Sequence, residues 1–247
     1  MDTECKRDMN RGLSTDIDVT FDVRRDTSKG RDPDTHSKTL RRYHRILWSK
    51  PLPSGLVFVL DDLTPGCYLH HKSVAGEFFL SSDSVIPTYN YRPDILSLTS
   101  ADALEAFDAI SYTIGGMMVF PGFQIDRKWT INQARGCEGL IADRFDLTLE
   151  CIRRHYSGGN SPLADVLARY SDFFGLFRDF RGYVEFFLLQ DLVGPDSSAV
   201  KIAAPFSDFS RSPVPSTADE YREYREATTA FLEARNQRIL RSRQCVA

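Results

Sequence analysis

Short segments in the N-terminal half alternate hydrophobic and polar residues with the two-residue period of a β-strand. The clearest is "IDVTFDV", residues 17–23, in which every second residue is apolar. Apolar runs of strand length follow, each bounded by Pro, Gly or Ser-Asp clusters: "GLVFVL" from Gly55, "GEFFL" from Gly76 and "MMVF" from Met117. The pattern predicts a mostly antiparallel sheet.

Helical periods interrupt these strands and dominate from Asn132 onward. Helices are expected at 36–50, after caps available at Asp34 and Thr35, and at 101–113, after a cap at Thr99 or Ser100. Ser161 and Pro162 form a cap pair before an apolar stripe with steps of three and four. The stripe, which we expect to be core, consists of Phe173, Phe177, Phe180, Val184 and Phe187.

The chain is expected to close with a long amphipathic helix over about 217–243, begun by a capping box of Thr217 and Glu220. Residues 1–16 are polar, lack a period and are expected to be flexible. The predicted fold is therefore α+β: residues 17–247 form a single domain, with the N-terminal sheet packed against a helical C-terminal half.

Composition excludes several classes of protein. The formal charge of −3 argues against a protein that coats nucleic acid by bulk electrostatics. The five cysteines are scattered and no two form a CxxC pair, so the sequence predicts neither a disulfide framework nor a metal site. With no apolar leader or membrane span, we expect a soluble, cytoplasmic protein.

The stretch "TINQARGCEGLIADRFDLTLECIRRHY", residues 130–156, places cations among apolar residues. If residues 140–156 form one helix, Arg144, Thr148 and His155 project into its apolar arc, whereas Asp146 and Glu150 lie on a solvated face. An unpaired charge in such an arc is costly. Two interpretations remain open: a buried structural ion pair, or a cleft in which Arg144 binds an anionic ligand.

Upstream, "TINQARG" reads as a polar turn that brings Asn132 and Arg135 to a helix start, where anions are favoured. Its spacing matches neither a P-loop nor a dinucleotide fingerprint, and we expect no cofactor. The alternative to anion binding is that these polar side chains make only the ordinary hydrogen bonds of a loop.

Other polar residues have similarly divided interpretations. Arg42 and His44, in "TLRRYHRILW", could form a phosphate-binding patch or a solvated basic face. His70 and His71 point to opposite sides of a strand, so they do not readily share a metal. In "SSDSV" the polar residues after a strand could line a site, although a plain turn around Asp83 explains them too.

Catalytic candidates are few. Glu185, in an aromatic-rich segment, is a candidate acid and a candidate partner of Arg144, and His155 is a candidate base. A nucleophilic arrangement would need Ser84, His155 and Asp143 together, but nothing in the sequence positions them so, and Asp143 lies on the wrong helix face. The catalytic residues therefore stay unknown.

Five segments together resemble a family of uncharacterised bacterial proteins, over about residues 17–240. They are "DPDTHSKTLRRYHRILWSKPLPSG", "GEFFLSSDS", "TINQARG", "DRFDLTLECIRRHYSGGNSPL" and "GYVEFFLLQDLV". The family is labelled a domain of unknown function, so the resemblance implies bacterial origin and one full-length domain but no activity. A more distant resemblance is to ADP-ribosyltransferases, through the order Arg41 or Arg42, Ser82 or Ser84, and Glu185.

Three functions follow as hypotheses. The first is binding, with or without turnover, of a phosphate-bearing small molecule or nucleic-acid end in a local electropositive cleft, by Asn132, Arg135, Arg144, Thr148, Arg42 and His44. The second is a non-catalytic module that binds a protein partner, for which the long C-terminal helix and the aromatic stripe support a surface. The third is an ADP-ribosyltransferase-like or hydrolytic enzyme.

Overall fold

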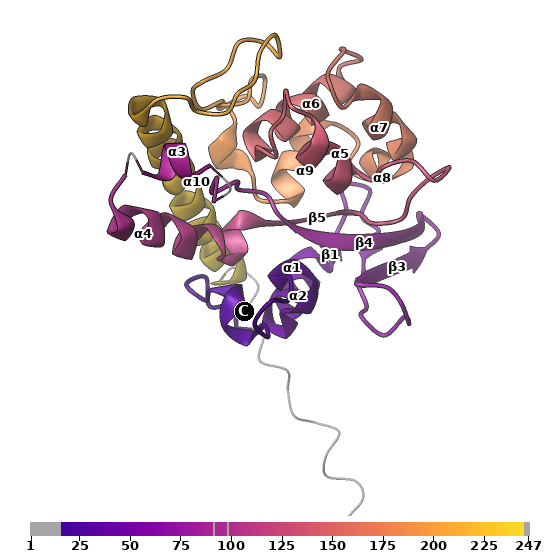
Figure 1. Ribbon diagram of the computed structural model, residues 1–247. Coiled ribbons are helices and arrows are strands. Elements are labelled where there is room, and N and C mark those ends of the chain that lie inside the picture. Colours follow the sequence, from indigo (N-terminus) through magenta and orange to yellow (C-terminus); the bar gives the residue numbers. More distant parts are fainter. Residues whose placement is uncertain (1–15, 91, 98, 245–247) are drawn as a thin grey trace, which may run out of the picture.

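A computed structural model of the protein describes residues 16–90, 92–97 and 99–244. The predicted flexible N-terminus, residues 1–16, lies outside this range except for its last residue. Within it, the fold is α+β, with small antiparallel sheets in the N-terminal half and helices in the C-terminal half, as predicted (Figure 1).

The larger described sheet is antiparallel, in the order β3-β4-β5, and the smaller pairs β1 with β2. In Figure 1 the larger sheet separates α1 (Pro33–His36) and α2 (Lys38–Trp48) from the helices α5 (Ile131–Cys137) to α9 (Phe180–Phe186). β5 is buried along its whole length, so both faces of the sheet are covered. The strands are β1 (Lys50–Pro51), β2 (Val57–Phe58), β3 (Leu69–Ser73), β4 (Gly76–Ser84) and β5 (Met117–Pro121).

Helices of the N-terminal half begin at side-chain caps. The Ser37 hydroxyl accepts a hydrogen bond from Leu40 N at 3.0 Å and starts α2. The predicted caps, Asp34 and Thr35, lie instead inside the short helix α1. The helices are η1 (Val23–Asp26), α1 (Pro33–His36), α2 (Lys38–Trp48), α3 (Pro93–Leu96), α4 (Ala101–Ser111, capped by Ser100 as predicted) and η2 (Ile114–Gly116).

Two predicted N-terminal strands differ from the structure. The segment 17–23 forms turns and then η1 rather than a strand, although Ile17, Val19 and Val23 are buried. Its backbone bonds locally instead: Phe21 N donates to Asp18 O at 3.2 Å. In "GLVFVL" only Val57–Phe58 pairs with another strand. Alternation in 17–23 therefore marked burial but not strand pairing, whereas in "GLVFVL" Phe58 and Leu60 are buried and Leu56, Val57 and Val59 are exposed.

The long helical run after Ser161 is divided into short helices. Left-handed backbone conformations at Arg178 (φ 68°) and Leu188 (φ 56°) interrupt it, and neither Ser161 nor Pro162 caps a helix, since α7 begins after Leu163. The predicted aromatic stripe is nevertheless buried, and that prediction is confirmed. The helices are α5 (Ile131–Cys137), α6 (Phe145–Tyr156), α7 (Ala164–Arg169), α8 (Ser171–Gly175), α9 (Phe180–Phe186), η3 (Gln190–Leu192) and α10 (Ala218–Gln244).

The single helix expected over 140–156 is shorter. Ala142 (φ 50°) and Asp143 (φ 63°) are left-handed, so α6 starts only after Arg144. Asp146 and Glu150, expected on a solvated face, are buried. Each carboxylate pairs with an arginine, which offsets the cost of its burial.

The buried hydrophobic residues form one cluster that extends from Ile17 to Ile239, so both halves of the chain share a core. α10, the long helix expected near the C-terminus, packs along α4 and η2. None of the helices in the described part of the chain is long and apolar enough to cross a bilayer.

Candidate functional site

The polar end of β4, "SSDS", places side chains on both faces of the sheet. Ser82 is directed toward α2, whereas Ser81 and Asp83 are directed toward α5, because successive residues of a strand alternate. The segment is paired strand, with Ser81 opposite Phe120 and Asp83 opposite Met118, and not the plain turn that was the alternative.

On the α2 side, His44 is fully buried rather than part of a basic surface patch. Its Nε2 lies 2.9 Å from Ser82 Oγ, and its Nδ1 lies 3.0 Å from the Trp48 indole Nε1. Indole can only donate, so Nδ1 accepts, and the imidazole proton must be on Nε2. Burial lowers the pKa of His44 to about 3. His44 therefore donates to Ser82 and cannot remove its proton.

On the other side, α5 delivers an amide and a guanidinium to β4. "TINQARG" is a helix rather than a polar turn, because Thr130 and Gln133 form a capping box. The Asn132 Nδ2 donates to Ser81 Oγ at 3.1 Å. Arg135 lies three residues on, about one turn along the same helix face, and contacts Asp83.

The Arg135 guanidinium is fully buried, and four hydrogen bonds and one further ion-pair contact surround it. Nη1 contacts Asp83 Oδ2 and lies 2.8 Å from Asp143 Oδ1. Nη2 donates to Val85 O at 3.2 Å and to Asp143 O, and Nε donates to Thr148 Oγ1 at 3.2 Å. Two carboxylates and two main-chain oxygens thus already surround this arginine, which is closed to solvent.

A third carboxyl group, Asp34 of α1, lies at the same end of β4. Its Oδ2 accepts a hydrogen bond from Ser84 N at 2.7 Å, and its Oδ1 is buried with no hydrogen-bond partner among the described residues. Burial raises the pKa of Asp34 to about 6. Burial, against the effect of Arg135, raises the pKa of Asp83 to about 7, and the nearby Asp143 and Asp34 add to the increase.

These groups line a pocket of about 400 Å³, here called the aspartate pocket. Three carboxyl groups share one guanidinium, so the cluster carries a net charge of −2 when fully ionised. In the described residues no group of three His, Cys, Asp or Glu side chains is arranged to hold a metal ion. The lining consists of Asp34, Asp83, Ser84, Ile86, Pro87, Thr88, Tyr89, Asn90, Tyr112, Gly136, Ala142 and Asp143.

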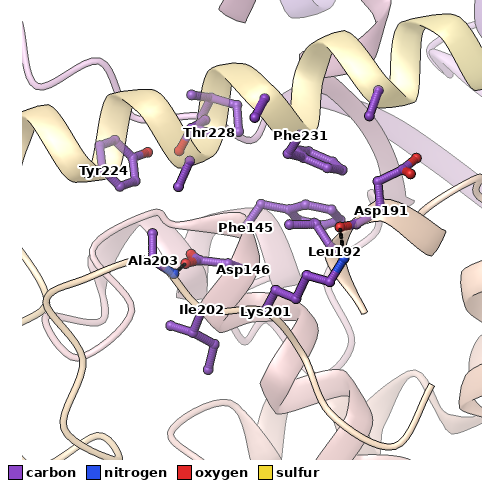
Figure 2. Close-up of a pocket in the computed structure, with 14 residues that line it drawn as sticks. Phe145, Asp146, Asp191, Leu192, Lys201, Ile202, Ala203, Tyr224, Thr228 and Phe231 are labelled. Carbon is purple, nitrogen blue, oxygen red and sulfur yellow. Dashed lines mark hydrogen bonds between the residues drawn. The ribbon is translucent and has the colours of Figure 1, made fainter. Parts of the chain in front are cut away.

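Arg144 is fully buried as well, but its environment differs. All five of its N–H donors have acceptors. Its Nε and Nη2 bind the two oxygens of Asp146 at 3.1 and 2.6 Å. The other three donors bind main-chain oxygens of Ala203, Pro205 and Pro213. Asp146 in turn accepts from Ala203 N at 3.0 Å (Figure 2). Arg144 therefore fastens the segment 203–213 to the start of α6.

The partner proposed for Arg144 from sequence, Glu185, is wrong: Glu185 is exposed and pairs with Arg181 at 2.8 Å, one turn away on α9. Thr148 connects the two buried arginines, since its Oγ1 accepts from Arg135 and donates to Arg144 O at 2.9 Å.

The remaining candidates contact other parts of the fold. The His155 ring packs on Phe174, with 5.2 Å between the centroids, and burial lowers its pKa. The Arg42 guanidinium lies 5.2 Å from the ring centroid of Tyr43. Asn132, Arg135 and Thr148 thus lie on one side of the end of β4 and His44 lies on the other. None of these four, nor Arg144, His155, Arg42 or Glu185, lines the aspartate pocket.

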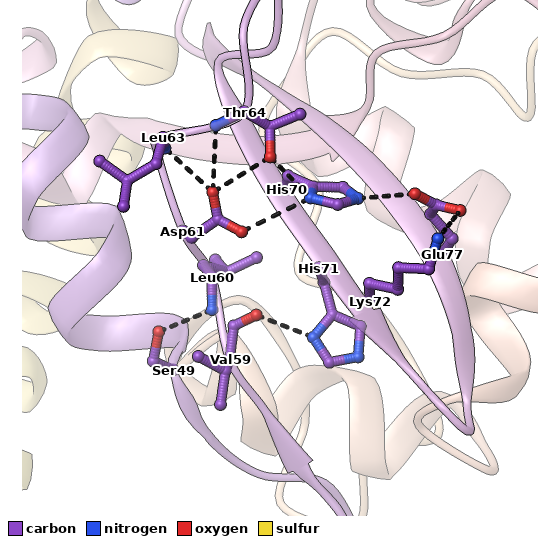
Figure 3. A network of polar contacts seen from close by, with 10 residues as sticks. All are labelled: Ser49, Val59, Leu60, Asp61, Leu63, Thr64, His70, His71, Lys72 and Glu77. Carbon is purple, nitrogen blue, oxygen red and sulfur yellow. Dashed lines mark hydrogen bonds and ion pairs between the residues drawn. The ribbon is translucent and has the colours of Figure 1, made fainter.

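A separate polar network surrounds the two adjacent histidines of β3 (Figure 3). The His70 ring lies between Thr64 Oγ1 at 2.9 Å and Glu77 Oε1 at 3.0 Å. The His71 Nδ1 lies 2.8 Å from Val59 O. The two rings have separate partners, in agreement with the opposite directions expected along a strand.

The sequence interpretation missed the carboxyl groups as a set. Asp34 was assigned to a helix cap, Asp83 to a turn and Asp143 to the wrong face of a helix that does not extend so far. The alternation of "SSDS" contained one usable signal, because it places Ser81 and Asp83 on the same face of β4. The convergence of Asp34 and Asp143 at that end of β4 depends on tertiary packing.

The chain belongs to a family of unknown function, DUF6994, whose family model matches residues 17–239. Neither the curated proteins nor the solved structures include a match to this chain.

Proposed function

We propose that the protein binds a small organic cation, an amine or a guanidinium, in the aspartate pocket. The observation that carries the proposal is that three carboxyl groups line one concave site, at which one buried guanidinium contacts two of them. Burial and mutual repulsion make ionisation of all three unfavourable, and the raised pKa values of Asp34 and Asp83 express that cost. A cationic ligand would supply the missing positive charge.

The same charges disfavour the phosphate-bearing ligand expected from the sequence. Arg135 is fully buried against two carboxylates, and an anion entering the pocket would meet the carboxylates of Asp34, Asp83 and Asp143. Repulsion between like charges is strongest where water is excluded. The buried arginine therefore holds the acids in place rather than receiving the ligand.

Cation binding is linked to pH in this proposal. Near neutral pH the free cluster retains protons, because the pKa of Asp83 is about 7 and that of Asp34 about 6. A cation favours the ionised carboxylates, so its binding releases protons and its affinity rises with pH across this range. A ligand that contacts only the walls of the pocket would show no such dependence.

The test measures thermal stability of the whole chain with millimolar agmatine, which carries an amine and a guanidinium, at pH 5.5 and pH 8. Inorganic phosphate serves as the anionic comparison. We expect agmatine to raise the Tm at pH 8, to raise it less at pH 5.5, and to lose its effect in Asp83→Asn. Asp102→Asn, at an exposed position on α4, is the matched control and keeps the wild-type response.

Two outcomes would overturn the proposal: no shift with agmatine at either pH, or a full shift in a folded Asp83→Asn variant. Isothermal titration in two buffers of different ionisation enthalpy separates binding at the carboxyl groups from binding elsewhere. Proton release on binding supports the proposal, and binding without proton exchange contradicts it.

A further inference from the structure

A second pocket, of about 370 Å³, lies between α10, the start of α6 and the segment 201–203. We call it the α10 pocket. Its walls are mainly apolar, with Phe145, Leu192 and Ile202 on one side and Tyr224 and Phe231 on α10. Figure 2 shows Tyr224, Thr228 and Phe231 on the side of α10 that borders this space. Its volume is at the small end of the range for ligand pockets, roughly 300–1,000 Å³.

Small side chains on α10 leave this space unfilled. Ala227, Ala230 and Ala234 follow one another at steps of three and four, so they share a helix face, and all three line the pocket. None of the three is buried. An apolar surface that is hollow and reachable from solvent is suited to a ligand, since burial of apolar area is favourable.

The acids of the α10 pocket are already neutralised. Asp146 is held by Arg144, and Asp191 is held by Arg238 through two hydrogen bonds of 2.8 Å. Lys201 differs, because its Nζ donates to the main-chain oxygen of Asp191 at 3.2 Å rather than to a carboxylate (Figure 2). An ammonium group has three donors, so this cation can bind an anionic group.

The wall that carries Lys201 is held in place before any ligand arrives. Ala203, two residues further on, forms hydrogen bonds with both Asp146 and Arg144. Arg144 also donates to the main-chain oxygens of Pro205 and Pro213, which hold the following segment. A preformed site avoids part of the ordering cost of binding. Arg144 therefore acts here as a positioning residue that touches no ligand.

We propose that the α10 pocket binds a hydrophobic monocarboxylic acid, with its apolar body between Phe145 and the alanine face of α10 and its carboxylate on Lys201. The two pockets have opposite charge preferences: the cluster around Arg135 is short of positive charge, whereas the rim here offers an ammonium group that donates to a main-chain oxygen rather than to a carboxylate. The inference stands independently of the organic-cation proposal.

The experiment titrates the full chain with octanoate, 4-phenylbutyrate and 1-octanol by calorimetry. The two acids distinguish an alkyl from an aromatic body, and octanol has the alkyl body without the charge. We expect at least one acid to bind about tenfold more tightly than octanol, and Lys201→Gln to remove most of that preference, since tenfold corresponds to about 1.4 kcal/mol.

Filling the cavity provides an independent test. Ala230→Leu places a larger side chain in the pocket and should weaken binding of the acid at least tenfold. Ala218→Leu, the same change in the first turn of the same helix and outside the pocket, should leave binding unchanged. Leucine has nearly the helix propensity of alanine, so neither change should disrupt α10.

The inference fails if neither acid binds the wild-type protein at millimolar concentration, if octanol binds as tightly as the acids, or if Ala230→Leu, shown to be folded by circular dichroism, retains full affinity. If Ala230→Leu does not fold, the comparison of the acids with octanol, in the wild type and in Lys201→Gln, still decides whether Lys201 binds the carboxylate. Asp83→Asn should bind the acid as wild type does, which distinguishes this pocket from the aspartate pocket.

Discussion

Arg135 and Arg144 come from one stretch of sequence, both are fully buried, and both bind carboxylates, yet their surroundings differ. Arg144 faces one carboxylate, Asp146, and three carbonyl oxygens, and its own charge is matched by one opposite charge. Arg135 contacts the carboxylates of two residues, Asp83 and Asp143, and a third acid lies close by.

Exposure of the acids differs as well. The Asp146 side chain is 10% exposed, whereas those of Asp83 and Asp143 are 22% and 42% exposed. The Arg144 cluster is closed to solvent and balanced in charge, as a structural ion pair must be to offset desolvation. The Arg135 cluster is open to solvent, and its negative charges outnumber its positive charge. Burial of an arginine therefore does not identify a site, and the charge balance around it is the better guide.

Removal of Arg144 should have the largest effect on stability. Arg144→Gln leaves Asp146 buried without its cation and three carbonyl oxygens without donors. Breaking a buried ion pair on one side typically costs about 3–5 kcal/mol. We expect a loss of that order in the free energy of unfolding, measured by urea titration.

Arg144→Lys is the control, because it keeps the positive charge but not the planar guanidinium. A lysine cannot match the two parallel bonds to Asp146, so it should recover only part of the loss. If Arg144→Gln were as stable as wild type, Arg144 would not be a clamp and the contrast with Arg135 would disappear.

Arg135→Gln should be destabilising in a way that depends on pH. At pH 5 the carboxyl groups of Asp34 and Asp83 are largely protonated, because their pKa values are about 6 and about 7. At pH 8 both ionise, and without the guanidinium they repel each other and Asp143. The loss of stability should therefore be greater at pH 8 than at pH 5, by about 1–3 kcal/mol. An equal loss at both values would mean that the cluster does not titrate in this range.

Asp34→Asn should stabilise the protein at high pH and not at low pH. The folded-state pKa of Asp34, about 6, lies above the ordinary value of 3.8, so the folded state binds the proton more tightly than the unfolded state. Stability then falls as pH rises from about 4 through about 6. Asparagine can still accept the hydrogen bond from Ser84 but has no charge to bury.

The expected gain at pH 8 is at most about 3 kcal/mol, with little change at pH 4, measured as the difference in unfolding free energy between variant and wild type. A gain of the same size at both values would point to a cause other than ionisation. A loss at pH 8 would show that the Asp34 carboxylate is already compensated, and would weaken the case for a cationic ligand.

Much of the fold could be predicted from the sequence because periodicity reports burial. Short apolar runs bounded by turn residues located β4 and β5, the cap at Ser100 located α4, and the aromatic stripe is core as expected. Boundaries set by backbone conformation were not predictable. Ala142 and Asp143 are left-handed without glycine, so no residue type signalled that α6 would begin so late.

The site was predicted only in part, for a physical reason. Asn132, Arg135 and Thr148 could be selected because polar groups in apolar surroundings need partners. The partners of Asn132 and Arg135 are Ser81 and Asp83, far away in the chain, and one sequence does not show which acid meets which arginine. The predicted sign of the ligand's charge rested on the arginines alone and did not include the carboxyl groups that packing brings to them.

Glu185 provides the smallest expected effect and the sharpest check on which acid belongs to Arg144. Glu185 pairs with Arg181 across one exposed turn of α9, and exposed pairs of this kind contribute little to stability. Glu185→Gln should therefore unfold at the same urea concentration as wild type, whereas Asp146→Asn should unfold much earlier. If the two substitutions were equally damaging, Glu185 would have a role that its exposed position does not explain. If neither were damaging, the charge balance of the Arg144 cluster would not be what stabilises it, and charge balance would cease to distinguish the two arginines.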